Sequence, residues 1–200
     1  MENILIFDSE TTGLPPKGAK YETDYLQFPH IVQLAWVFNG IYKDHIIKPE
    51  GYEIPKEATA IHGITTEMAT EKGQSFKSVI DEFIDDCFVA KKIVGHNIYF
   101  DTSIIKANIL RSEVPAFFFD KADIALDKEK RICTMMRTIK FVNAKYPDGR
   151  GGKFPKLEEL YLKLFNETFP AHNALEDVKA TERCFNELVN LKIIELDGIN

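Results

Sequence analysis

The chain has 200 residues, with 25 lysines and arginines against 31 aspartates and glutamates, and a formal net charge of −6. That length suits one α/β domain with a full core, so we expect a single domain over residues 1–200. The acidic balance excludes the electrostatic footprint of a strong non-specific nucleic-acid binder, although it tolerates a local basic patch.

Cysteine usage and the N-terminal residues indicate the compartment. The three cysteines, Cys87, Cys133 and Cys184, are scattered and form no C-x-x-C pair, which is typical of a reducing environment. The apolar residues 4–7 lead straight into a core strand, so we expect no signal peptide and a cytoplasmic location. No apolar run is long enough to span a bilayer, which predicts no membrane partner.

Two carboxylates follow the first apolar run. Residues 4–7 are unbroken Ile, Leu, Ile and Phe, typical of a strand that is buried on both faces. Because side chains alternate along a strand, Asp8 and Glu10 point to the same side at its carboxyl end. Ligand sites of open α/β sheets commonly lie beyond such ends. A turn-capping Asp8 and a solvated Glu10 explain this segment equally well.

The rest of the chain alternates between strand and helix signals. Asn39 and Gly40 separate two apolar runs and predict a tight hairpin turn. Residue periodicity then predicts strands over residues 31–38, 41–47, 91–95 and 131–134, and helices over residues 74–88, 99–111, 135–142 and 156–165.

A third carboxylate lies in the helix predicted over residues 99–111. Apolar residues recur at helical spacing around Asp101, so this acid shares the inward face of the helix rather than the solvated one. Just before the helix, we interpret His96 as a hydrogen-bonded structural histidine and Asn97 as a turn or cap residue.

A basic loop precedes the last part of the chain. Residues 143–156 contain one acid, Asp148, and four cations, Lys145, Arg150, Lys153 and Lys156. Three glycines make the loop flexible, and Tyr146 and Phe154 are able to stack on bases. A grip on a polyanion and an ordinary polar surface loop are equally good interpretations.

The fourth carboxylate belongs to the last helix. Asn173 followed three residues later by Glu176 resembles a capping box, so we expect a helix to start near residue 174 and end near 191. Asp177 falls on its inward stripe near the N-terminus, where the helix dipole favours an anion. His172 lies within reach of whatever Asp177 binds. We interpret it as a general base, with a backbone-bonded loop histidine as the alternative.

The four acids share one difficulty. Asp8, Glu10, Asp101 and Asp177 lie among apolar residues and have no obvious basic partners in the sequence. Ionised groups are rarely buried unless they are paired or bind a metal. The set therefore predicts divalent cations, and oxygen ligands without a Cys/His cluster favour Mg²⁺ or Mn²⁺ over a structural zinc.

In order and spacing these stretches resemble the DEDD exonuclease superfamily, in its histidine-containing branch. The matches are D-x-E-T-T-G-L from Asp8, H-N-x-x-F-D ending at Asp101, and H-x-A-x-x-D from His172. A fourth match, I-P…A…I-H-G-I-T, falls at residues 54–65. The branch includes the proofreading subunit of bacterial DNA polymerase III, ribonuclease T and oligoribonuclease.

The resemblance covers nearly the whole chain, with two departures. Ser9 stands where many members carry Thr or Val, and residues 15–30 form a longer segment than in minimal members. The resemblance implies a ribonuclease-H-like α/β fold with a mixed central sheet flanked by helices. It also implies a two-metal 3′→5′ exonuclease that releases nucleoside monophosphates.

The resemblance further implies a role for each site residue. Asp8, Glu10 and Asp177 would hold the ion that activates water, Asp8 would bridge to a second ion, and Asp101 would support the site. His172 would take the proton from the water. The terminal nucleotide would lie against a pocket formed by Thr11, Thr12, Gly13, Leu14, Ile61 and His62. A tight strand exit with core packing explains the pocket residues as well.

The expected partner is the 3′ end of a nucleic acid. Single-stranded DNA is the expected substrate, RNA trimming is the alternative, and a DNA polymerase subunit is a further partner that the resemblance suggests. A phosphatase with Asp8 as nucleophile is a rival, but it leaves Asp101 and the pair of His172 and Asp177 unexplained. A non-catalytic end-binding or polymerase-partner module is a second rival, and the intact set of five residues argues against it.

Overall fold

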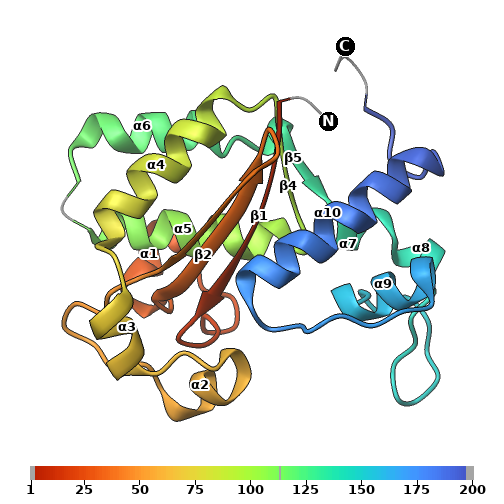
Figure 1. Ribbon diagram of the computed structural model, residues 1–200, viewed down its shortest axis with the longest axis horizontal. Helices are drawn as coiled ribbons and strands as arrows, with labels where there is room; N and C mark the ends of the chain where they lie inside the picture. The colour runs from red at the N-terminus through yellow and green to blue at the C-terminus, as the bar shows by residue number, and fades with distance from the viewer. Residues whose placement is uncertain (1–2, 113, 197–200) are drawn as a thin grey trace.

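A computed structural model describes residues 3–112 and 114–196, and within them five strands form one sheet (Figure 1). The strands are β1 (Ile4–Thr11), β2 (Ile31–Phe38), β3 (Ile41–Ile46), β4 (Lys92–Gly95) and β5 (Arg131–Cys133). Their order is β3-β2-β1-β4-β5. β1, β2 and β3 pair antiparallel, whereas β4 runs parallel to β1 and β5 parallel to β4. The predicted mixed sheet is confirmed.

Helices cover both faces of this sheet (Figure 1). One face packs against α4 (Phe76–Val89), α5 (Ile98–Arg111) and α6 (Ala116–Ala125), and the other against α9 (Leu157–Phe165) and α10 (Ala174–Asn190). Shorter helices join these elements: α1 (Tyr21–Asp24), α2 (Lys56–His62), α3 (Thr66–Lys72), α7 (Thr134–Arg137) and α8 (Ile139–Val142). Two 3₁₀ turns, Tyr25–Gln27 and Lys128–Lys130, complete the set. No helix in the described ranges is long and apolar enough to cross a membrane.

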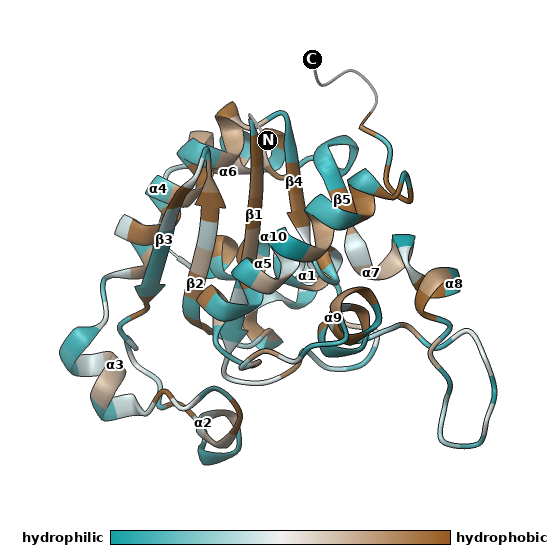
Figure 2. Cartoon of the chain, turned by 45° about the vertical axis from the view of Figure 1, so that its right-hand side comes forward, coloured by the Kyte–Doolittle hydropathy of each residue, from teal (hydrophilic) through white to brown (hydrophobic). Residues whose placement is uncertain are grey.

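The central strand β1 begins with an unbroken apolar run, residues 4–7 (Figure 2). Leu5 and Phe7 belong to the core on the α4 and α5 side, and Ile4 and Ile6 to the core on the α10 side. A strand covered on both faces cannot alternate between apolar and polar residues. The same alternation decides on which face each polar residue after Phe7 emerges.

The predicted hairpin and most predicted elements are confirmed within a residue or two. Asn39 and Gly40 both have positive φ, as a two-residue turn between twisted strands requires. The helix predicted over residues 135–142 is instead divided into α7 and α8 at Thr138. The buried hydroxyl of Thr138 donates to the carbonyl of Thr134 at 2.7 Å, a bond that competes with the helical backbone pattern.

Four helices were not predicted from the sequence: α1, α2, α3 and α6. The first three have four to seven residues each, too few turns to show a clear apolar period. The long segment over residues 15–30 contains α1 and lies against α5. The Arg111 guanidinium donates to the Tyr25 carbonyl at 2.7 Å and also to that of Phe28, and the Asn108 amide donates to the Pro29 carbonyl at 2.9 Å. Two residues of α5 therefore hold this segment in place.

Candidate active site

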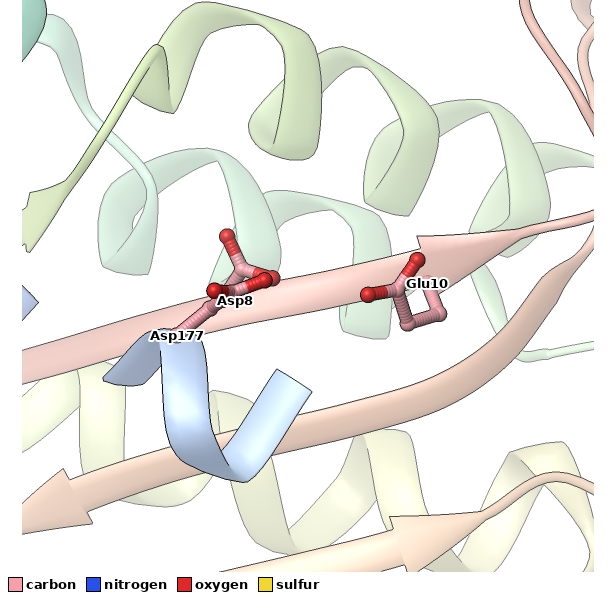
Figure 3. A group of neighbouring side chains, drawn as sticks. All are labelled: Asp8, Glu10 and Asp177. Atoms are coloured by element: carbon pink, nitrogen blue, oxygen red, sulfur yellow. The ribbon is translucent and has the colours of Figure 1, made fainter. Parts of the chain in front are cut away.

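Three of the predicted carboxylates form one cluster (Figure 3). Asp8 and Glu10 project from β1 on the side that faces α10, and Asp177 projects from the first turns of α10. One carboxylate oxygen from each of the three lies within 4.8 Å of the others. Residues 167 positions apart in the chain are thus brought to within the span of a single cation's coordination shell.

The start of α10 is fixed to the sheet by a residue that the sequence did not single out. The side chain of Gln33, buried in β2, accepts a hydrogen bond from the Ala174 backbone N–H at 3.1 Å. Its amide nitrogen donates to Asp44 on β3 at 2.7 Å. Gln33 also pairs with Glu10 in the β1–β2 register. A glutamine within the apolar run of β2 was the signal that could have revealed this anchor.

The N-terminus of α10 shows one of the two interactions of the predicted capping box. The Asn173 side chain accepts from the backbone N–H groups of Leu175 and Glu176, at 3.1 and 3.3 Å. Glu176 does not complete a capping box, because its carboxylate pairs with Lys179 at 2.7 Å, one turn further along α10. The single-residue cap is sufficient to start the helix and set the place of Asp177.

Asp101 lies beside the cluster rather than in it. It comes from the N-terminal turn of α5, is 3% exposed, and accepts a 2.7 Å hydrogen bond from the Ser9 hydroxyl. Ser9 emerges from β1 on the face opposite Asp8 and Glu10. The predicted inward orientation of Asp101 is confirmed. Its carboxylate adds negative charge next to the three clustered acids.

Burial raises the pKa of all four acids, and neighbouring acids add to the shift in Asp8, Glu10 and Asp177. Within residues 3–112 and 114–196, none of the four forms a salt bridge with a basic side chain. Burial, with smaller contributions from Asp177 and Asp101, raises the pKa of Glu10 to about 7. Burial and the charges of Asp101, Asp177 and Glu10 raise the pKa of Asp8 well above its ordinary value. Burial also dominates the raised pKa values of Asp101 and Asp177.

The chemistry of this donor set fits divalent ions. Acidic oxygens that approach one another without a cation repel when ionised, and a hard divalent ion relieves both the repulsion and the desolvation. Asp8, Glu10 and Asp177 are the residues that could hold such an ion. The described residues place no histidine or cysteine in this cluster, so its ligand set is that preferred by Mg²⁺ or Mn²⁺.

His172 lies on the turn just before α10 and is exposed to solvent. Its backbone has a φ of +69°, and its N–H donates to an Asp177 carboxylate oxygen at 3.2 Å. The backbone of this turn therefore contacts the acidic cluster directly. The role of the imidazole as a base stays a prediction.

The predicted pocket residues flank the end of β1. After Thr11 and Thr12 the chain turns at Gly13, whose φ of +154° suits few residues with a side chain. Beyond it Leu14 is 82% exposed, and Ile61 near the end of α2 is 60% exposed. His62, the last residue of α2, is buried; its Nδ1 accepts from the Ile64 N–H at 3.1 Å. Two large apolar side chains are thus left open to solvent on the segments that follow β1 and form α2.

The chain has relatives and structural counterparts among known proteins. A model of the exonuclease family typified by RNase T matches residues 5–185. The chain therefore belongs to this exonuclease family. The match includes β1, α5 and α10, the elements that carry the four acids.

Individual relatives are more distant. The chain is 28% identical over 178 residues to DNA polymerase III subunit epsilon of Haemophilus influenzae, covering 88% of this chain and 62% of that protein. The Pasteurella multocida subunit is 27% identical, with 88% and 63% covered. The chain thus spans less than two thirds of the length of these relatives.

Solved structures share the fold. E. coli exonuclease I in complex with a dT13 oligonucleotide superposes with a TM-score of 0.70 at 24% identity, covering 94% of this chain and 41% of that one. Exonuclease I from Methylocaldum szegediense gives 0.69 at 22% identity, with 95% and 41% covered. The predicted ribonuclease-H-like fold and the predicted superfamily are confirmed.

The raised pKa values predict how stability depends on pH in the metal-free protein. An acid whose pKa is higher in the folded than in the unfolded state stabilises the fold below the unfolded value, and that contribution is lost as pH rises through the folded value. For Glu10 this window runs from its ordinary 4.5 to about 7. The melting temperature in EDTA should therefore fall between these pH values, as calorimetry or thermal fluorescence would measure.

Divalent ions should reverse that loss. At pH 8 and about 100 times Kd, an ion that binds only the folded state adds about 2.7 kcal/mol, or roughly 5–11 °C in Tm for a chain of this size. Asp8→Asn should raise the metal-free Tm and remove most of the response to Mn²⁺. Glu71→Gln, which removes an exposed carboxylate of α3 outside the cluster, is the control and should keep the response. An Asp8→Asn protein with a normal Mn²⁺ response would place the ion elsewhere.

Proposed function

We propose that the chain is a metal-dependent 3′→5′ exonuclease that releases nucleoside monophosphates from the end of a nucleic acid strand. The observation that carries the proposal is the cluster of Asp8, Glu10 and Asp177 at the meeting point of β1 and α10. Membership of the exonuclease family supports the same reaction class. The acidic cluster explains why such a protein needs divalent ions.

In this proposal Asp8, Glu10 and Asp177 would hold the two divalent ions, Mg²⁺ or Mn²⁺. When bound, the ions supply Lewis-acid activation of water and stabilisation of the leaving 3′ oxygen. Asp101 supports the site from α5, and its bond from Ser9 fixes its carboxylate against β1. Gln33 keeps Asp177 in register with Glu10 by docking the first residue of α10 to β2.

His172 takes the proton from the attacking water. A base of this kind must be accessible to solvent and close to the ligands, and the exposed turn bonded to Asp177 supports both conditions. The positive φ of His172 makes the turn sensitive to the residue type, which matters for the choice of a test variant.

The terminal nucleotide lies against Thr11, Thr12, Gly13, Leu14, Ile61 and His62. The exposed side chains of Leu14 and Ile61 offer apolar surface to its base and sugar. Single-stranded DNA is the proposed substrate, and short RNA the alternative. The similarity to epsilon subunits supports a DNA polymerase subunit as a proposed partner and the cytoplasm as the proposed location.

The loop between α8 and α9, residues 143–156, serves in this proposal as an arm that contacts the phosphates. It projects from the body of the protein (Figure 2). Arg150 lies over the Tyr146 ring at 5.3 Å and pairs with Asp148 at 2.7 Å, whereas Lys153 pairs with Glu159 at 2.6 Å. The Arg150 pair is exposed and therefore weak, so a phosphate can displace Asp148.

The polarity of the reaction is tested with a 5′-labelled single strand of DNA in Mg²⁺. We expect a descending ladder of labelled products, which stops when EDTA is added. Asp177→Asn should reduce turnover to the level seen in EDTA, whereas the control Glu71→Gln on α3 should retain it. A label released at once as a mononucleotide would show the opposite polarity. A labelled RNA of the same sequence, run in parallel, compares the two substrate classes.

The base is tested with His172→Asn, since asparagine tolerates the positive φ at this position better than alanine does. We expect a loss of roughly 10²–10⁴-fold in kcat, the usual range for a missing general base. Binding of the strand should change little. A normal kcat in His172→Asn would assign His172 to structure alone.

The arm is tested with the double variant Lys145→Ala, Arg150→Ala. Loss of phosphate contacts should raise KM for a long strand, preserve kcat, and reduce the slope of log affinity against log salt by about 2. The matched control Lys77→Ala, Lys91→Ala removes the same net charge from exposed positions on and just after α4. Equal effects from the two double variants would mean that overall charge, and not the arm, governs binding.

A further inference from the structure

His96 occupies the turn between β4 and α5, and its ring joins two other segments. Its Nδ1 lies 2.9 Å from the Thr134 hydroxyl, at the start of α7. Its Nε2 lies 2.9 Å from the Pro155 carbonyl, at the end of the arm formed by residues 143–156. Thr134 is fully buried, and Pro155 is buried as well.

The partners determine the tautomer of the ring. A carbonyl oxygen only accepts, so Nε2 carries the hydrogen that is donated to Pro155. A neutral ring then accepts at Nδ1 from the Thr134 hydroxyl. Burial lowers the pKa of His96 to about 4, which keeps the ring neutral near pH 7. Both ring nitrogens are satisfied, as expected for a buried polar side chain.

The base of the arm is fixed at three neighbouring points. His96 bonds the Pro155 carbonyl, and Glu159 of α9 accepts from the Lys156 backbone N–H at 2.8 Å and from the Lys153 ammonium at 2.6 Å. The two Glu159 bonds tie the arm only to the helix that follows it. His96 ties it to the strand whose continuation, α5, carries Asp101.

We propose that His96 is a positioning residue, which fixes the direction of the arm relative to the carboxylate cluster so that a bound strand enters the site in register. The inference rests on the proposed function. What it adds to that function is that one hydrogen bond, from His96 Nε2 to the Pro155 carbonyl, couples the arm to the end of β4.

Loss of the hydrogen bond between His96 and Pro155 should affect the binding of a long strand but not the chemistry at the acids. The acids keep their positions without His96, because Ser9 holds Asp101 and Gln33 holds the start of α10. Chemistry at the site should therefore persist when the bond is lost. Productive binding of a long strand should weaken, because an arm that samples many directions loses phosphate contacts.

Two substitutions separate the two ring contacts. The amide nitrogen of His96→Gln reaches about as far as Nε2 and can still donate to the Pro155 carbonyl. His96→Asn can occupy only the place of Nδ1, so it keeps the Thr134 contact and loses the arm. For His96→Asn we expect KM for a long strand to rise about three- to tenfold, the effect of losing one hydrogen bond, with kcat unchanged. His96→Gln should remain near the parent protein.

Two further readouts make the outcome decisive. Limited trypsin digestion should cut the arm after Lys145, Arg150 or Lys153 several times faster in His96→Asn than in His96→Gln, whether or not the protein is a nuclease. Hydrolysis of thymidine 5′-(p-nitrophenyl phosphate), too small to reach the arm, should be equal in all three proteins. Should His96→Asn fail to fold, His96→Leu, which cannot donate to the Pro155 carbonyl, should give the same pattern.

The results distinguish the inference from the function on which it rests. If the parent protein degrades the strand but His96→Asn matches His96→Gln in KM and in tryptic cleavage, the inference is wrong and the function stands. If the parent protein hydrolyses neither substrate, the proposed function is wrong, and the tryptic comparison alone decides whether His96 holds the arm.

Discussion

Repulsion between carboxylates is the constraint around which this protein is built. Asp8, Glu10 and Asp177 approach within 4.8 Å, with Asp101 close by, although burial and mutual charge oppose their ionisation. A fold tolerates such an arrangement only if the surrounding structure holds the acids in place. Here the support consists of polar bonds: Gln33 to the backbone of Ala174, and Ser9 to Asp101. Divalent ions would convert the unfavourable cluster into a binding site.

The helices on the two faces of the sheet place different parts of the site on different sides of β1. Because β1 is covered on both faces, its even-numbered acids reach the α10 side, while Ser9 contacts α5 on the other side. Leu14 and Ile61 are exposed where we propose that a nucleotide binds, and the arm carries cations on a loop that projects from the body (Figure 2). A protein with a net charge of −6 can in this way present positive charge to a polyanion locally.

The sequence predicted the acids and the main elements because both leave local patterns. Apolar runs and helical spacing mark β1 and α5, and Asn173 marks the start of α10. Gln33 left only a faint signal, since its partner Ala174 is 141 residues away and nothing local requires a glutamine in β2. The break at Thr138 and the short helices α2 and α3 depend on tertiary packing, and the residue pattern of a short stretch of sequence does not reveal such packing. His96 was predicted to be a hydrogen-bonded structural residue, but its partners come from two distant segments that only the fold brings together.

The central claim is that the three clustered acids form a divalent-cation site, and anomalous X-ray diffraction from crystals grown with Mn²⁺ tests it most directly. The account predicts an anomalous peak within coordination distance of carboxylate oxygens of Asp8, Glu10 and Asp177, at about 2.0–2.4 Å, and its loss in Asp8→Asn crystals. A fully soaked crystal with no peak between these three residues, or with its strongest peak on acids elsewhere, would contradict the account.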